Sequence, residues 1–243
     1  MDLGAPRLAA ALAGLDPAGS ASGYCVALSG GLDSCVLLQA MVALRGPGGA
    51  PRMRAVHVDH GLQPEAAAWA GSCRSLCQRL DVPIEVVCLE LVPAPGASVE
   101  AEARDARYAA FAALLRPGEW LLTAHHRDDQ LETVLIQLLR GAGVAGLCAM
   151  PELARLGGGW HARPLLELDR AALAAYAGQH GLDWVRDPMN ESTRFDRGWL
   201  RAQVLPAIRQ RWPAAGATVA RSAGHLAEAR RLLDELAHAD AAG

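Results

Sequence analysis

The sequence predicts an α/β fold, a doubly wound and mostly parallel sheet followed by a small helical C-terminal extension. Four strand-like apolar runs alternate with helical patterns, as is typical of such sheets, at 24–28, 53–58, 84–89 and 120–124. A glycine-rich turn directly follows the first run. The chain has 243 residues, 51% of them hydrophobic and 20% charged, which is enough for a sizeable core in one or two domains.

The same patterns place the remaining elements in chain order. A short capping helix and a loop are expected within residues 1–22. Helices are expected at 35–44, 64–80, 98–115, from 127 onward, and at 170–180, 200–211 and 217–239. Gly- and Pro-rich or polar segments predict loops at 46–51, 93–96 and 187–190. Residues 157–161 predict a hairpin or an edge strand, 163–166 predict a turn, and Gly181 is the expected C′ residue of the preceding helix.

The net charge of −3 is unevenly distributed along the chain. The stretch from Arg194 to Arg231 contains eight arginines and two acidic residues, Asp196 and Glu228, which gives it a charge of +6. The rest of the chain therefore has a charge of −9. This basic end indicates phosphate-rich ligands or, alternatively, a solvated helical face. No apolar run reaches the roughly 18 to 20 residues of a membrane span, and the N-terminus shows no signal-peptide pattern, so the cytoplasm is expected.

The six cysteines form no C-x-x-C pair, and most lie in apolar runs where cysteine behaves as a small hydrophobe. Cys73 and Cys77 share a helical face but have no nearby partner pair for zinc or an iron–sulfur cluster. We therefore expect reduced structural thiols.

The turn Ser29-Gly-Gly-Leu-Asp-Ser34 lies between a strand and a helix, the layout that brings phosphate to a helix N-terminus. Gly30 and Gly31 permit close backbone approach, and the two serines add hydroxyl donors. The chain contains no lysine, which excludes the common G-x-x-x-x-G-K-[ST] loop. Asp33 puts a carboxylate beside the phosphates and so predicts an intervening cation such as Mg²⁺. The alternative is a plain turn with a capping serine.

The densest polar cluster is His125-His-Arg-Asp-Asp-Gln-Leu-Glu-Thr133, which begins where the fourth strand ends. Asp129 and Glu132 are three residues apart and share one face of the next helix. With Asp33 expected opposite, they predict a Mg²⁺–phosphate site or a cage for a substrate ammonium. H-E-x-x-H is absent, which disfavours zinc. Acidic residues in a first helical turn, Asp128 above all, are alternatively simple partners of the helix dipole.

The hexapeptide at 29–34 resembles the PP-loop of N-type ATP pyrophosphatases, which gives the expected fold a PP-loop, Rossmann-like character. Further motifs occur in the order found in the tRNA(Ile)-lysidine synthetase family: VHVDHGL (56–62), EARDARYAAF (102–111), TAHHRDDQLETVLIQLLRGAGVAGLCAM (123–150), RPLL (163–166) and DPMNESTRFDRGWLR (187–201). The resemblance runs from about Tyr24 to about Glu235. It implies adenylation of C2 of the wobble cytidine in a CAU-anticodon tRNA(Ile), followed by displacement of AMP by the ε-amine of free lysine.

The resemblance also implies residue roles. The expected catalytic residues are Asp33, Asp129, Glu132 and Arg197. ATP is expected to contact Ser29, Gly30, Gly31, Leu32, Asp33, Ser34, His57, Arg104 and Arg107, with Mg²⁺ at Asp33 and Asp129. Arg201 joins Arg197 as a candidate contact of AMP or of the tRNA backbone. For Arg104 and Arg107, which share a helical face, surface solvation is the alternative. Gly198 stands where the family has asparagine, which removes an amide and is expected to loosen a helix start.

The resemblance divides the chain into a PP-loop ATP pyrophosphatase core (1–150), a continuation of the catalytic domain with a basic helical region (151–215), and a C-terminal helix or linker (216–243). The family's further C-terminal tRNA-binding domains are expected to be absent. Expected partners are tRNA(Ile) with the CAU anticodon and free L-lysine, with no membrane; a homodimer is left open.

Two alternatives stay open at this point. A PP-loop tRNA thiolation enzyme would need a catalytic cysteine or paired C-x-x-C motifs, which the sequence does not show. A non-catalytic ATP-binding module would not need Asp129 and Glu132. Pyrophosphate release that depends on both tRNA and lysine separates these alternatives from the synthetase.

Overall fold

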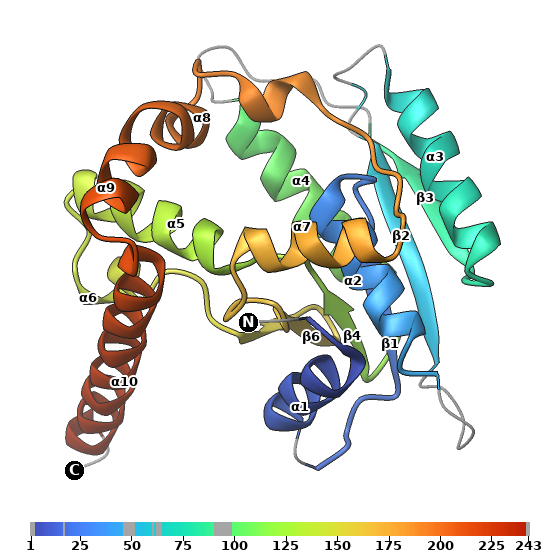
Figure 1. Cartoon of the computed structure of the whole chain (residues 1–243). Helices are drawn as coiled ribbons and strands as arrows, with labels where there is room; N and C mark the ends of the chain where they lie inside the picture. Colours follow the sequence, from blue (N-terminus) through green and yellow to red (C-terminus); the bar gives the residue numbers. More distant parts are fainter. Residues whose placement is uncertain are drawn as a thin grey trace. The chain divides into compact units, whose positions relative to one another are not determined.

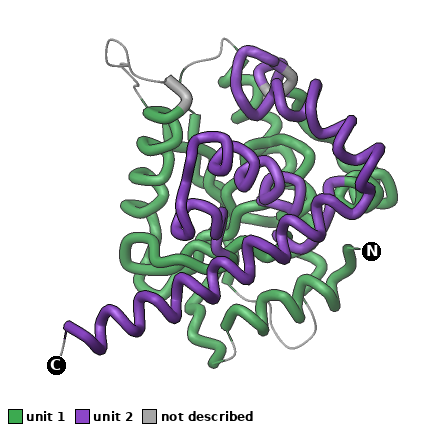
Figure 2. The backbone as a smooth tube through the Cα atoms, turned by 90° about the vertical axis from the view of Figure 1, so that its left-hand side faces the viewer, with its two compact units in different colours: residues 1–124, 152–165, 171–186 green, residues 125–151, 166–170, 187–243 purple. Residues whose placement is uncertain are grey.

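The computed structural model describes residues 3–16, 18–45, 52–59, 61, 65–89 and 99–241. The chain divides into two compact units, which Figure 2 distinguishes by colour. Unit 1 comprises residues 1–124, 152–165 and 171–186, and unit 2 comprises residues 125–151, 166–170 and 187–243. The loops expected at 46–51 and 93–96 lie outside the described residues, as do His60, Leu62 and Ser98.

Unit 1 is built on a six-stranded sheet of order β3-β2-β1-β4-β6-β5 (Figure 1). The strands are β1 (Gly23–Ala27), β2 (Met53–Asp59), β3 (Ile84–Cys88), β4 (Glu119–Leu122), β5 (Leu153–Leu156) and β6 (Gly159–Ala162). All neighbours pair in parallel except β5, which forms an antiparallel hairpin with β6. The mostly parallel sheet is confirmed, and the predicted hairpin forms one edge of it. The strand order reverses between β1 and β4, which is where sheets of this kind bind ligands.

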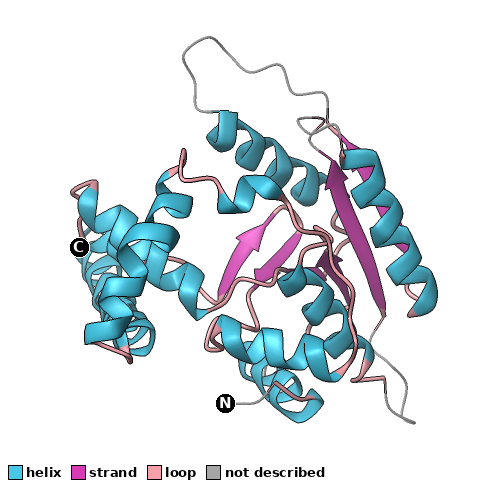
Figure 3. Cartoon of the chain, turned by 45° about the horizontal axis from the view of Figure 1, so that its top comes forward, coloured by secondary structure: helices cyan, strands magenta, loops and turns pink. Residues whose placement is uncertain are grey.

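Helices cover both faces of this sheet (Figure 3), namely α1 (Ala5–Leu15), α2 (Leu32–Val42), α3 (Ala66–Arg79), α4 (Val99–Leu114) and α7 (Arg170–Gln179). On one face, Phe111 of α4 packs in a buried cluster with Val56 and Leu121 of the strands. On the other face, His57 of β2 meets Cys73 of α3. The doubly wound arrangement predicted from the alternation of strands and helices is therefore confirmed.

The end of α7 shows why the glycine signal was informative. Gly181 has φ +57°, a left-handed conformation that glycine adopts without strain. The N–H of Leu182 donates to the carbonyl of Ala177 at 3.0 Å, which closes a Schellman motif. The predicted C′ glycine is confirmed.

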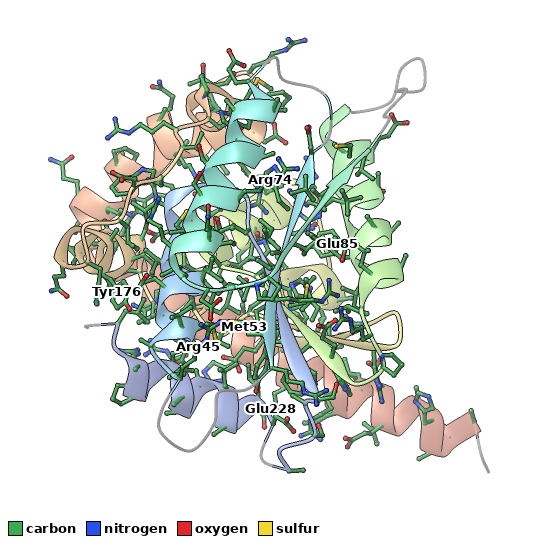
Figure 4. The ribbon with its side chains drawn as sticks, turned by 90° about the vertical axis from the view of Figure 1, so that its right-hand side faces the viewer. Arg45, Met53, Arg74, Glu85, Tyr176 and Glu228 are labelled. Atoms are coloured by element: carbon green, nitrogen blue, oxygen red, sulfur yellow. The ribbon has the colours of Figure 1, made fainter. Side chains whose placement is uncertain are left out.

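A buried ion pair ties the amino ends of the strands together. Arg54 of β2 donates through Nε and Nη2 to the carboxylate of Glu119 of β4, at 2.8 and 2.7 Å. Its Nη1 reaches Glu85 of β3 at 3.0 Å, and Figure 4 labels Glu85 on that strand. The guanidinium also donates to the carbonyl of Leu114 at the end of α4. This residue therefore links three strands and one helix at the edge opposite the predicted site.

Unit 2 is helical within the described residues: α5 (Arg127–Leu139), α6 (Val144–Leu147), the 3₁₀ turn η1 (Pro188–Glu191), α8 (Asp196–Trp199), the π-helical segment η2 (Leu200–Val204), α9 (Leu205–Arg211) and α10 (Ala215–Ala241). The helix expected at 200–211 begins earlier, at Asp196, and contains the π turn. Pro206 explains this turn because proline has no N–H to donate and its ring clashes with the carbonyl four residues before it. No helix in the described part of the chain has the length and hydropathy to cross a membrane.

Candidate functional site

The loop between β1 and α2 is held in a conformation that requires glycine at its second position. Gly30 has φ +85°, and a Cβ there would lie 3.1 Å from Sγ of Cys73. Its carbonyl accepts the N–H of Val185 at 2.9 Å. Both the backbone angle and the lack of space therefore fix this residue as glycine.

Gly31 is glycine for a different reason. Its φ of −74° suits any residue, and a Cβ would meet only Oγ of Ser29, at 3.4 Å. Among the described residues no side-chain hydrogen bond caps α2. The N–H groups at a helix start point out of the helix, where they can donate to an anion. The hydroxyls of Ser29 and Ser34 lie 3.0 Å apart beside this turn. Free space, backbone N–H groups and two hydroxyls make a donor set that fits phosphate; Leu32 and Asp33 are the first residues of the helix.

His57 supports this loop from its buried side. The imidazole is 4% exposed, and its Nδ1 lies 2.8 Å from the carbonyl oxygen of Leu28, the residue before the loop. The same nitrogen is 3.5 Å from Sγ of Cys73. These contacts indicate that the side chain positions the end of β1, and a direct contact of His57 with ATP stays a prediction.

In unit 2, His126 is the N-cap of α5, a role that the sequence analysis missed. Its Nδ1 accepts the N–H of Asp129, and the Asp129 carboxylate accepts the N–H of His126 at 3.0 Å, which together form a capping box. A histidine cap is unusual, so only the strand-to-helix change at this point signalled it. The box fixes the orientation of Asp129 at the start of the helix.

Arg201 of η2 binds both predicted carboxylates. Its Nε and Nη2 donate to the two oxygens of Glu132, and Nη2 also reaches Oδ1 of Asp129 at 3.0 Å. Arg197 of α8 adds Nη1 at 3.8 Å from Oε2 of Glu132, and its Nη2 donates to the hydroxyl of Thr133 at 2.9 Å. The shared helical face of Asp129 and Glu132 is confirmed, and Glu132 is the deeper of the two, with 1% of its side chain exposed against 12%.

The electrostatics of Glu132 oppose its charged form. Burial raises the pKa of this carboxyl above its ordinary value, although the hydrogen bonds and charge of Arg201 act in the other direction. A carboxylate kept in such surroundings is poised to exchange a proton or to accept a cation. Any cation that binds here must share the carboxylates with Arg201 or replace it.

Asp128 turns to other partners on the same helix turn. Its Oδ1 pairs with Arg209 of α9 at 2.8 Å, and its Oδ2 accepts the backbone N–H of Arg170 at 3.3 Å. The side chain therefore links α5 to two other segments of unit 2. This favours the structural alternative for Asp128.

Gly198 does not loosen the helix start, and this expectation is corrected. A Cβ at this position would lie 1.9 Å from the carbonyl oxygen of Ser192, so glycine allows the loop before α8 to pack against the helix backbone. The residue is buried within α8. The missing side chain thus creates a close backbone contact in the segment that carries Arg197 and Arg201.

The predicted magnesium site needs Asp33 of unit 1 together with Asp129 of unit 2 and stays a prediction. In the described part of the chain, no three His, Cys, Asp or Glu side chains are grouped as metal ligands. Mg²⁺ commonly takes one or two protein carboxylates and completes its shell with water and substrate phosphates. Asp33, a carboxylate in the first turn of α2, fits that chemistry.

The cysteines behave as structural residues. Four of the six are buried: Cys25, Cys35, Cys73 and Cys77. Burial raises the pKa of the first three thiols to about 12 and that of the fourth to about 11. A thiol with such a pKa is protonated at neutral pH and is a poor nucleophile, which disfavours thiolation through these residues.

Arg104 and Arg107 of α4 share a helical face, as predicted. Their guanidinium carbons lie 5.5 and 5.8 Å from the centre of the Tyr108 ring. Beneath that ring, Tyr108 approaches His161 of β6, with 5.5 Å between the two ring centres. A contact between His161 and Tyr108 was not predicted, because nothing in the local sequence indicates a contact between residues so far apart in the chain.

Comparison with known proteins bears on this site. Residues 7–208 match the family model described as the PP-loop domain. The chain is similar to tRNA(Ile)-lysidine synthases of Pseudomonas syringae, with 53% identity over 95% of this chain and 52% of the relative, and of Escherichia coli O157:H7, with 50% identity over 87% and 49%. It spans about half the length of these curated relatives. A U34-tRNA thiolase from Methanococcus maripaludis has the same fold, with a TM-score of 0.75 and 15% identity over 92% of this chain and 78% of that one.

Proposed function

The chain belongs to the PP-loop domain family, and from this premise we propose that it is the catalytic part of a tRNA(Ile)-lysidine synthase. It would join free lysine to C2 of the wobble cytidine in tRNA(Ile) with the CAU anticodon, consuming ATP and releasing AMP and pyrophosphate. The observation that carries this proposal is the identity of about half of its residues with such synthases over almost the whole chain. The name of these relatives, tRNA(Ile)-lysidine synthase, supports tRNA(Ile) as the substrate. The cytoplasm, where tRNA is found, is the expected place of the reaction.

In the first half-reaction, the loop at 29–34 holds the phosphates of ATP at the N-terminus of α2. The cytidine oxygen attacks the α-phosphorus, the bond to the bridging oxygen breaks, and pyrophosphate leaves with the electron pair. Backbone N–H groups and the Ser29 and Ser34 hydroxyls stabilise the charge on the leaving phosphates. Mg²⁺, held by Asp33 and Asp129, would neutralise further charge there. In this proposal His57 orients the loop through its contact with the carbonyl of Leu28.

In the second half-reaction, the ε-amine of lysine attacks C2, and the C2–O bond breaks so that AMP leaves with that oxygen. An ammonium must first lose a proton to become a nucleophile. Glu132, whose surroundings favour proton uptake, is the group we assign to lysine recognition and proton transfer. Displaced from the carboxylates, Arg201 is able to bind phosphate with its planar fork, and Arg197 lies beside it.

The proposal is tested by incubating the chain with labelled lysine, ATP and a tRNA(Ile) transcript bearing the CAU anticodon. We expect lysine to be incorporated into the tRNA. Over many turnovers, we expect pyrophosphate to be released only when both tRNA and lysine are present. Asp33→Ala should abolish pyrophosphate release, whereas Glu228→Gln, an exposed carboxylate change on α10, should not alter it. Near-normal turnover in folded Asp33→Ala protein would remove Asp33 from the mechanism.

A single-turnover experiment separates the two half-reactions. With labelled ATP, Glu132→Gln is expected to form adenylated tRNA and then stall before lysidine, with a sharply raised lysine requirement. Failure to adenylate, or lysidine formation at the normal rate, would contradict the role given to Glu132. Pyrophosphate release without any need for tRNA would overturn the proposed function itself.

A further inference from the structure

A second polar cluster lies in unit 1, at the carboxyl ends of β4 and β6. Nε2 of His161 lies 2.8 Å from the hydroxyl of Thr123, which follows β4. Nδ1 of the same ring lies 3.2 Å from Nη2 of Arg163, and His161 and Arg163 are 3% and 7% exposed. A guanidinium can only donate, so Nδ1 is the acceptor and the ring proton sits on Nε2, donated to Thr123.

Arg163 connects this cluster to α4. Its side chain hydrogen-bonds to Tyr108, whose ring also contacts Phe111 edge-on. Arg104 and Arg107 approach that ring, one turn before it and one residue before it along the helix. Contact with an aromatic ring restrains the long arginine side chains, so less conformational entropy is lost when they bind a ligand.

The electrostatic potential at this cluster is positive. Burial above all, and then the charges of Arg163, Arg104 and Arg107, together lower the pKa of His161 to about 3. His161 therefore stays neutral at physiological pH and keeps accepting from Arg163. The cluster keeps one hydrogen-bonding state across the range in which a tRNA enzyme works.

We propose that Arg104 and Arg107 bind backbone phosphates of the RNA strand beside the reacting nucleotide, and that Arg163 is a positioning residue that holds Tyr108 beneath them. This rests on the proposed function. The phosphates of ATP are accounted for by the loop at the end of β1. Because β4 lies between β1 and β6, His161 on β6 is two strand spacings, about 10 Å, from the strand that leads into that loop. We therefore assign the phosphates at Arg104 and Arg107 to the RNA strand that carries the reacting cytidine.

The alternative is that the cluster only fastens α4 to the sheet. The positioning role proposed for Arg163 differs from this purely structural role in one measurable respect. Arg163→Lys retains the positive charge but cannot hold His161 and Tyr108 at once. It should therefore weaken RNA binding without changing the number of phosphates that are neutralised, whereas loss of Arg104 or Arg107 should change that number.

The probe is a fluorescent anticodon stem-loop RNA with CAU in its loop, titrated with the whole chain at several KCl concentrations. We expect Arg104→Gln and Arg107→Gln each to reduce the slope of log K against log[KCl] by about 0.7, the value for one single-strand phosphate contact. Arg163→Lys should keep the slope and lower affinity about 10-fold at every salt concentration. Tyr108→Phe should also keep the slope and lower the affinity. The double variant Arg163→Lys with Tyr108→Phe should bind RNA no more weakly than either single variant.

Arg155→Gln is the matched control, because Arg155 also lies over an aromatic ring, 3.9 Å from the centre of Trp160, on the β5–β6 hairpin. It should change neither slope nor affinity, and Mg·ATP affinity should be unaffected in every variant. An unchanged slope in Arg104→Gln and Arg107→Gln would overturn the proposal. So would weakened ATP binding with normal RNA binding, which would assign these arginines to ATP.

Two further outcomes keep the test decisive. If Arg163→Lys does not fold, Tyr108→Phe still tests the positioning role, since it keeps the ring and every charge. Normal affinity in that variant would contradict it. If the wild-type chain forms no lysidine while the arginine variants still reduce the slope as expected, RNA binding by Arg104 and Arg107 is supported and the proposed function is contradicted.

Discussion

Replacement of Arg201 tests whether Glu132 is held as a charged group in unit 2. Arg201→Gln removes both hydrogen bonds to a carboxylate that is 1% exposed and leaves Arg197 at 3.8 Å as its charged neighbour. Removing one partner of a buried ion pair costs about 3–5 kcal/mol. Arg201 itself is 39% exposed, so we expect the lower end, about 3 kcal/mol, or roughly 6–12 °C in Tm for a chain of this size.

The loss should depend on pH in a defined direction. In the variant, burial still raises the pKa of Glu132 while the opposing influence of Arg201 is gone, so this pKa rises further. The folded chain then binds the proton more tightly than the unfolded chain does. Its free energy of unfolding therefore falls as pH rises from the ordinary glutamate value through the raised one. We expect the variant to be closer to wild type at pH 5.5 than at pH 8.

Urea unfolding at both pH values measures this, with Arg221→Gln as the control. Arg221 is exposed on α10 and forms no ion pair among the described residues, so its loss should stay within about 0.5 kcal/mol. The double variant Arg201→Gln with Glu132→Gln should recover most of the stability, because no uncompensated charge remains. A loss below about 1 kcal/mol, or one equal at both pH values, would refute the reasoning.

Three other substitutions follow from the same geometry. Gly30→Ala should lose about 1–3 kcal/mol and most ATP binding, measured by urea unfolding and nucleotide titration, because φ is +85° and the new Cβ would lie 3.1 Å from a sulfur atom. Gly198→Asn, which restores the family residue, should destabilise the chain rather than repair it, since its Cβ would overlap the Ser192 carbonyl; normal Tm would contradict this. Glu119→Gln should cost about 3–5 kcal/mol at pH 7, and the deficit should shrink in acid. Burial raises the pKa of Glu119, but the hydrogen bonds from Arg54 and Arg116 and the charges of both arginines together hold it below its ordinary value, so the contribution of Glu119 disappears as pH falls through that pKa.

The parts of the fold that local sequence encodes were predictable. All four parallel strands of the first half lie within two residues of their expected bounds, because apolar runs and glycine or proline punctuation depend only on neighbours. The loop at 29–34 and the C′ residue Gly181 were predictable for the same reason. The helix at 196–211 was less so, since its π turn follows from Pro206 acting four residues upstream.

The partners of the site residues could not be read from the sequence. Arg201 and Glu132 are 69 residues apart, and the motif that contains Arg201 suggested a contact with AMP or tRNA, not with the carboxylates. The cluster of His161, Thr123 and Tyr108 was missed because each residue comes from a different element. Gly198 misled, since a glycine in a helix pattern looks like a weakness until the neighbouring backbone is known.

The basic segment from Arg194 to Arg231 shows that a count of charges along the sequence does not indicate which of them are neutralised in the structure. Of its eight arginines, Arg197, Arg201, Arg209, Arg230 and Arg231 pair with carboxylates of unit 2. Among the described residues, Arg194, Arg211 and Arg221 form no ion pair. The local excess of +6 is thus largely compensated by acidic residues that lie elsewhere in the sequence. A phosphate attracts charge that its neighbours have not already neutralised, so the pairing, and not the count, decides where RNA binds. Binding of tRNA by this segment stays a prediction that concerns those three arginines, and Arg201 can contribute only when a substrate cation takes its place at Glu132.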